Sequence, residues 1–183
     1  MVIMNKITLL ILLSTVSLIN AQEFSIGVKG GVNLSSYYET NTNDLSQRTL
    51  YHVGLVTDVI LSDKFSFAPE LLFSAEGFEV KDSDFSVDLN YLRVPLLMKY
   101  YVTDSFSLNI GPQFGALIKA KNSEGDNLEN TKSLDFGFKF GSTYTLGSGL
   151  IVDTSWNYGL TSIVDDLQIR QSMLQFSLGY ILN

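Results

Sequence analysis

Residues 89–102 read LNYLRVPLLMKYYV, and the order of their side chains decides the expected fold. From Leu92 onward the residues fall into two series, because side chains on a strand alternate between its two faces. One series is apolar (Leu92, Val94, Leu96, Met98, Tyr100), whereas the other contains two cations (Arg93, Pro95, Leu97, Lys99, Tyr101). A strand of about ten residues with this pattern suits a tilted strand that crosses a bilayer within a closed barrel.

The same alternation recurs along the chain between turn-forming or polar segments. We expect eight strands, at Glu23–Ser35, Leu50–Leu61, Phe65–Glu76, Leu89–Val102, Phe106–Lys119, Leu134–Tyr144, Leu150–Leu160 and Leu174–Leu182. Three connections are tight turns, at Ser62–Lys64, Thr103–Ser105 and Gly147–Gly149. The other four are longer and polar, at 36–49, 78–88, 122–131 and 161–168. Alternating short and long connections are typical of bacterial barrels. The sequence therefore predicts an all-β fold, an eight-stranded antiparallel up-and-down transmembrane β-barrel.

Composition limits the classes of partner. The 183 residues are 45% hydrophobic and 17% charged, which suits either a soluble all-β domain or a membrane barrel. The net charge of -7 argues against nucleic acid, and against an anionic membrane surface, as a partner through bulk electrostatics. The chain has no cysteine, which excludes disulfides, thiolate nucleophiles and cysteine-based zinc sites.

The first residues form a separate unit. Lys6 precedes an apolar run from Ile7 to Ile19, and the small residue Ala21 follows shortly after it. The run is too short for an ordinary spanning helix and fits a secretory signal. We expect residues 1–21 to be a cleaved signal peptide and residues 22–183 to be the barrel domain of an integral bacterial outer-membrane protein.

The two faces of the strands predict which side meets lipid. An eight-stranded interior is only just wide enough for side chains to fill it, so the bulky apolar face does not fit inside. The opposite face is rich in small residues, namely Gly27, Gly31, Gly54, Ala68, Ser74, Gly111, Gly115, Gly137, Gly141, Ser155, Gly159 and Gly179. Outward aromatic residues also gather near both ends of the strands, at Phe24, Phe65, Tyr100, Phe106, Tyr144 and Tyr180 at one end and Tyr51, Trp156 and Tyr158 at the other. Such belts suit the two membrane interfaces.

The small-residue face also carries balanced charges, five of each sign. They are Lys29, Arg93, Lys99, Lys119 and Lys139 against Asp58, Glu70, Glu76, Asp135 and Asp153. An enclosed interior tolerates ions only when they are paired and hydrogen-bonded. We therefore expect these ten residues to form a structural charge network in a narrow lumen.

Five segments of the chain are informative together, namely Asn20–Gln22, Phe24–Asn33, Tyr91–Tyr100, Leu108–Pro112 and Phe176–Tyr180. They resemble the outer-membrane β-barrel (porin family) proteins of Bacteroidota, which include PorT-like proteins. The resemblance implies the barrel fold, insertion by the barrel-assembly machinery, and an accessory role in a secretion or envelope-assembly system as one alternative. The last strand resembles an assembly signal but ends in Leu182-Asn183 instead of an aromatic residue.

No residue pattern predicts an enzyme, a cofactor or a metal site. His52 is the only histidine and is expected to be a hydrogen-bonded filler of the lumen. Pro95 removes one ladder hydrogen bond, so we expect a local bulge there. The predicted function is a non-enzymatic integral outer-membrane barrel that acts structurally or by binding through its external loops, with outer-membrane lipid and a possible envelope protein as partners. A soluble lipocalin-like barrel for a small lipophile is the other alternative.

Overall fold

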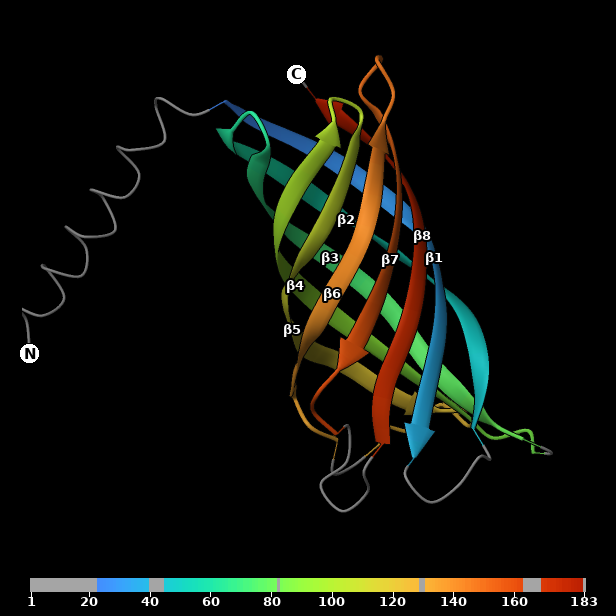
Figure 1. Cartoon of the computed structure of the whole chain (residues 1–183). Helices are drawn as coiled ribbons and strands as arrows, with labels where there is room; N and C mark the ends of the chain where they lie inside the picture. The colour runs from blue at the N-terminus through green and yellow to red at the C-terminus, as the bar shows by residue number, and fades with distance from the viewer. Residues whose placement is uncertain (1–22, 40–44, 82, 129–130, 163–168, 183) are drawn as a thin grey trace, which may run out of the picture.

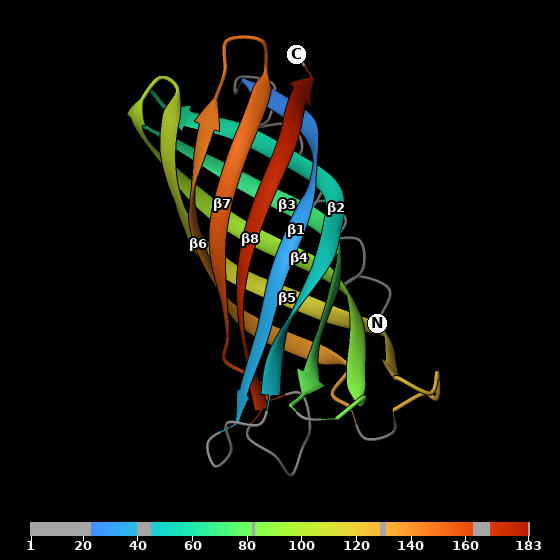
Figure 2. The same ribbon diagram turned by 90° about the vertical axis from the view of Figure 1, so that its right-hand side faces the viewer.

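The computed structural model describes residues 23–39, 45–81, 83–128, 131–162 and 169–182. The strands are β1 (Phe24–Glu39), β2 (Leu45–Ser62), β3 (Phe65–Val80), β4 (Ser86–Thr103), β5 (Phe106–Asn122), β6 (Leu134–Thr145), β7 (Leu150–Gly159) and β8 (Ile169–Leu182). Neighbours in sequence pair antiparallel, and β8 pairs with β1, so the sheet closes into a barrel (Figures 1 and 2). The predicted fold class is confirmed. The signal peptide expected at residues 1–21 lies outside the described residues.

Bulky apolar side chains point away from the barrel axis and charged ones point into it. Ile110 and Leu178 are 59% and 61% exposed, whereas Arg93 and Glu76 are 2% and 0% exposed. Both aromatic belts lie on the outer face; for instance, the rings of Phe65 and Tyr100 pack with centroids 5.2 Å apart. The predicted orientation of the two faces is therefore confirmed.

The short turns join strands at one end of the barrel, which is also the end where β1 begins and β8 ends (Figure 1). In the last of these turns Gly149 has φ +86°, a left-handed conformation that glycine adopts without steric cost. The described residues contain no helix that is long and apolar enough to span a bilayer.

Several strands run further toward the long-loop end than the sequence predicts. β2 begins at Leu45 and β3 ends at Val80, within segments that we expected to be loops. β2 and β4 each have 18 residues, whereas β7 has 10. A ladder of backbone hydrogen bonds holds a hairpin outside the bilayer without needing an apolar outer face. Because the outer residues of these extensions are polar, the sequence pattern indicated loops there instead of strands.

The bulge expected at Pro95 is absent. Pro95 lies opposite Gln113 of β5, and the same register joins Val94 to Phe114 and Met98 to Ile110. The register between β3 and β4 is also unchanged on either side of Pro95. This prediction is wrong because the paired residues on both sides keep the register despite the missing N–H group.

Candidate functional sites in the lumen and on the outer face

The centre of the lumen holds a four-residue ion cluster. Lys29 Nζ lies 2.6 Å from Glu70 Oε1 and 3.4 Å from Asp153 Oδ1. Lys139 Nζ lies 2.9 Å from the other oxygen of Glu70. Asp153 also accepts a hydrogen bond of 2.8 Å from Thr143 Oγ1. Each ion has a partner of opposite charge, which is the condition for burying it.

Nearer the long loops, Arg93 forms a second cluster. Its guanidinium donates to both oxygens of Glu76, over 2.9 Å from Nε and 2.6 Å from Nη2. It also pairs with Asp135, and its Cζ lies 4.2 Å from the ring centroid of Tyr91. Gln171 completes the cluster by donating to Glu76. Four strands thus contribute to this layer of the lumen.

A smaller group lies toward the short turns. Asp58 Oδ2 accepts hydrogen bonds from Lys99 Nζ at 2.7 Å and from the Tyr101 hydroxyl at 2.9 Å. Asp58 is only 6% exposed. Nine of the ten predicted charged residues therefore lie in the lumen, as three ion-paired groups at successive depths.

Lys119 is the exception, because its side chain is exposed on the outer face. Asn90 of β4 is opposite Lys119 of β5, whereas the next residue, Tyr91, is opposite Leu117. β5 thus has one extra residue here, and a bulge of this kind turns the following side chains over. The lumenal prediction for Lys119 is wrong for this reason. The lumen keeps four cations (Lys29, Arg93, Lys99, Lys139) and five carboxylates (Asp58, Glu70, Glu76, Asp135, Asp153).

His52 lies between the central cluster and the Arg93 cluster, in an arrangement that the sequence did not indicate. Its Nδ1 is 2.7 Å from Asn33 Oδ1, and its Nε2 is 2.8 Å from Ser177 Oγ. A serine, a histidine and an orienting amide in this order match the connectivity of a hydrolase triad. However, Ser177, His52 and Asn33 are only 4%, 1% and 0% exposed, so a substrate does not reach them. The three residues fill the lumen with satisfied polar groups.

An apolar cap closes the lumen at the long-loop end. It consists of buried Tyr37, Phe78, Val87, Leu89, Tyr91 and Ala120, with partly buried Leu45, Leu117 and Leu128 packed against them. Leu89 is 0% exposed, and the rings of Tyr37 and Phe78 lie 5.3 Å apart. We did not predict this cap, although the alternation of Val87, Leu89 and Tyr91 carries its signal.

Ion pairs, neutral polar side chains and the apolar cap thus fill the middle and the long-loop end of the lumen. At the short-turn end a depression of about 260 Å³, lined by Asp58 and Tyr101 among others, remains open. Within the described ranges, no group of three or more His, Asp or Glu side chains is arranged to hold a metal ion.

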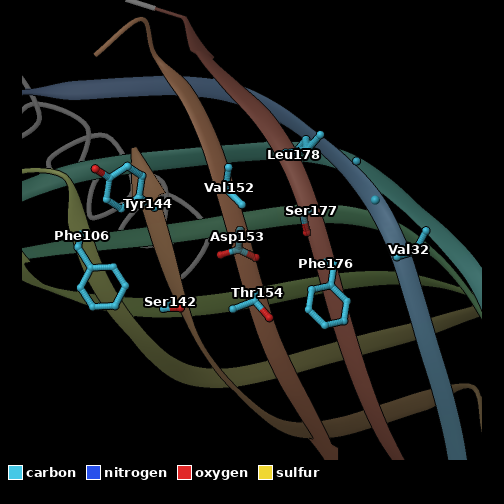
Figure 3. Close-up of a pocket in the computed structure, with 12 residues that line it drawn as sticks. Val32, Phe106, Ser142, Tyr144, Val152, Asp153, Thr154, Phe176, Ser177 and Leu178 are labelled. Atoms are coloured by element: carbon cyan, nitrogen blue, oxygen red, sulfur yellow. The ribbon is translucent and has the colours of Figure 1, made fainter. Parts of the chain in front are cut away.

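The outer face carries a groove of about 450 Å³ across β1, β8, β7, β6 and the first residue of β5. Phe106, Tyr144 and Phe176 stand around the small Ser142 and Thr154 (Figure 3). The lining also includes Gly30, Gly31, Val32, Val152, Asp153, Ser177 and Leu178. The groove belongs to the apolar belt, where small residues interrupt a surface of large ones, and it faces the hydrocarbon chains of the bilayer.

An outward apolar belt, an ion-paired interior and closure of all strand edges define an eight-stranded transmembrane β-barrel. Residues 20–165 match the family described as "Outer membrane protein beta-barrel domain", and the chain belongs to this family. It is accordingly an integral outer-membrane protein. The soluble lipocalin-like alternative does not fit this outcome, because the bulky apolar side chains lie outside the barrel.

Solved structures of low sequence identity share the fold. One is Ail, the attachment invasion locus protein of Yersinia pestis, crystallised in complex with the heparin analogue sucrose octasulfate. Ail is 18% identical to this chain with a TM-score of 0.56, and the match covers 87% of this chain and 99% of Ail. Neisserial surface protein A (NspA) is 10% identical with a TM-score of 0.58, covering 86% of this chain and 96% of NspA. A comparison with curated proteins found no match.

Proposed function

We propose that this protein is a non-enzymatic outer-membrane barrel that acts through its loop-side surface, by binding or by structural contacts. The filled lumen carries the proposal. Arg93 and its partners occupy the bore beneath the apolar cap, and the Lys29 cluster occupies it again further down. Because the bore is not open, only the loops and the outer face of the barrel are available to bind other molecules. The lumenal charges then serve to hold the strands in register.

The test compares a loop variant with a lumenal variant for their ability to restore function in the native host. One variant replaces residues 123–127 by a glycine-serine linker, and a second replaces the lumenal ion pair nearest the short turns by Asp58→Leu/Lys99→Met. We expect both to insert and to shift on gels after heating. Only the loop variant should fail to complement a deletion strain. Loss of complementation by the lumenal variant alone would contradict the proposal.

The non-enzymatic assignment rests on the burial of Ser177 and His52. A fluorophosphonate probe, which labels activated serines, should leave the folded protein unlabelled. Labelling that disappears in Ser177→Ala would instead identify a hydrolase.

Finer assignments follow from the resemblance of Tyr91–Tyr100 and the other matching segments to PorT-like proteins of Bacteroidota. On this basis we infer that residues 1–21 are a cleaved signal peptide, that the barrel-assembly machinery inserts the chain, and that an accessory role in secretion or envelope assembly is the second candidate. Crosslinking in living cells tests that role. Recovery with a large envelope complex, lost on replacement of residues 123–127, would support it, whereas recovery of the barrel alone would exclude it.

A further inference from the structure

A second depression of about 260 Å³ lies on the barrel wall at the long-loop end. Its lining consists of Leu50, Tyr51, Ala75, Asp88, Asn90, Lys119 and Lys121. Ala75 is the small residue of the set and is 6% exposed beneath its neighbours. We call this depression the lysine pocket.

The bulge in β5 creates the lysine pocket. Beyond it, Lys119 lies opposite Asn90 and Lys121 lies opposite Asp88, so these four residues share the outer face. Without the extra residue, Lys119 would point into the apolar cap, where an unpaired ammonium group is costly. A bulge often re-aims a side chain for a purpose. Here it places two cations side by side on the wall of the barrel.

The lysine pocket lies at the edge of the apolar belt. Ile118, which precedes Lys119, is 59% exposed, and Leu92, two residues from Asn90, is 39% exposed. Tyr51, at the opposite side of the pocket, is 56% exposed and belongs to the aromatic belt. Tyrosine at such an edge suits the headgroup layer of a membrane. The pocket is therefore level with the headgroups of the outer leaflet.

The charges around the pocket favour an anion. Asp88 pairs with Arg48, which also bridges to Glu79 with Nε 3.1 Å from Oε1. Among the described residues, Lys119 and Lys121 have no ion-pair partner. Asp88, Arg48, Glu79 and the two lysines together leave one positive charge, on the lysine side, although the whole chain carries -7. The acids Glu124 and Asp126 lie in the exposed turn that follows Lys121 and do not line the pocket.

We propose that the lysine pocket binds the phosphate group of an outer-leaflet lipid. Lys119 and Lys121 donate to the phosphate oxygens, for which the compact ammonium group is a suitable donor. Leu50 and Tyr51, on the other side of the pocket, contact the part of the lipid that adjoins its phosphate group. A bound lipid is favoured over a soluble anion because the apolar belt continues directly below the lysines, so one ligand satisfies both surfaces.

The test measures lipid retention by the purified full barrel in phosphatidylcholine nanodiscs. The probe is a bisphosphorylated glycolipid, lipid A, and native mass spectrometry counts the bound molecules. We expect retention to weaken roughly fivefold for Lys119→Gln or Lys121→Gln and roughly thirtyfold for both. Lys119→Arg should retain the lipid. Lys64→Gln, the same charge change in an exposed short turn, is the matched control and should have no effect.

Two measurements on the unaltered protein keep the proposal testable if a variant folds poorly. Dephosphorylated lipid A should be retained no better than phosphatidylcholine. Inorganic phosphate at millimolar concentration should not displace lipid A. Equal loss in Lys64→Gln, retention independent of the phosphates, or displacement by inorganic phosphate or by a soluble sulfated polysaccharide would overturn the proposal of a lipid site.

Discussion

Arg93 on β4 donates to both carboxylate oxygens of Glu76 on β3, over 2.9 Å and 2.6 Å, directly beneath the apolar cap. The same guanidinium pairs with Asp135 of β6, across the intervening strand β5. Arg93 therefore joins three strands, two of which are not neighbours in the sheet. Because this one buried side chain has two acidic partners, a single substitution of Arg93 has a large consequence for stability.

Replacing Arg93 by leucine should strongly destabilise the barrel. Two buried carboxylates then lose their cation, and breaking a buried pair costs about 3–5 kcal/mol. The measurement is the free energy of unfolding by urea in phospholipid vesicles. Arg93→Leu/Glu76→Leu should recover part of the loss, because one of the two orphaned carboxylates is removed. If the single and double variants are equally unstable, Arg93 stabilises through packing and not through its charge.

Two buried asparagines should respond differently to the same change. Asn33 donates to Ala75 O at 2.7 Å and accepts from Gln175 at 2.8 Å and from His52, whereas both side-chain atoms of Asn157 have no hydrogen-bond partner within the described chain. Asn33→Ala leaves several buried groups unsatisfied at roughly 1–3 kcal/mol each. Asn157→Ala should change the unfolding free energy by less than about 1 kcal/mol. Equal losses in the same urea titration would contradict this account.

Gly31→Ala should disturb the seam between the first and last strands. A Cβ at Gly31 would lie 1.9 Å from the carbonyl oxygen of Phe176 on β8. Backbone has to move to accommodate it, and overpacking of this kind costs about 1–3 kcal/mol or more. Gly147→Ala is the control, because no heavy atom lies within 4 Å of its Cβ position. The heat-modified gel shift and refolding yield should fall for the first variant only. A normal yield for Gly31→Ala would show that the seam is more adaptable than this contact indicates.

Trp156 reports directly on the orientation of the strands. It is the only tryptophan, is 39% exposed on the outer face, and donates from Nε1 to Ser172 Oγ at 2.9 Å. Brominated lipids should quench its fluorescence, and bromines near the headgroup should quench more than bromines at the chain end. Quenching by aqueous iodide but not by lipid would place the ring away from the bilayer.

The filled lumen predicts that the protein does not conduct ions steadily. The cap residues Leu89 and Tyr91 are 0% and 2% exposed, so water has no continuous path along the bore. The check is single-molecule recording in a planar bilayer, with insertion verified by the gel shift of the same sample. Regular unit conductance in the unaltered protein would contradict a closed lumen.

The sequence is sufficient for the strand number, the connections and the choice of face, because all three depend on local alternation. A strand such as Leu92–Tyr100 displays both of its faces within ten residues. Pairing across strands depends instead on register, which the sequence does not display. Ser177 meets His52 over a separation of 125 residues only because β8 closes on β1.

Lys119 is a case in which local alternation gives the wrong face because the register changes. Counted from Phe106, it falls on the inner face, but one extra residue opposite Asn90 and Tyr91 reverses the count. The cap was missed for a related reason, since Phe78 and Val87 lie in a segment whose charged neighbours indicate a loop. Local polarity does not distinguish a loop in water from a hairpin that continues above the membrane.

The unequal lengths of β2 and β4, with 18 residues each, and β7, with 10, make the mouth of the barrel oblique. Among the described residues, the strands are therefore longer on the β2–β4 side of the barrel than at β7. A molecule that binds there from outside the cell therefore meets an asymmetric surface. Any complex formed there has one preferred rotational orientation about the membrane normal.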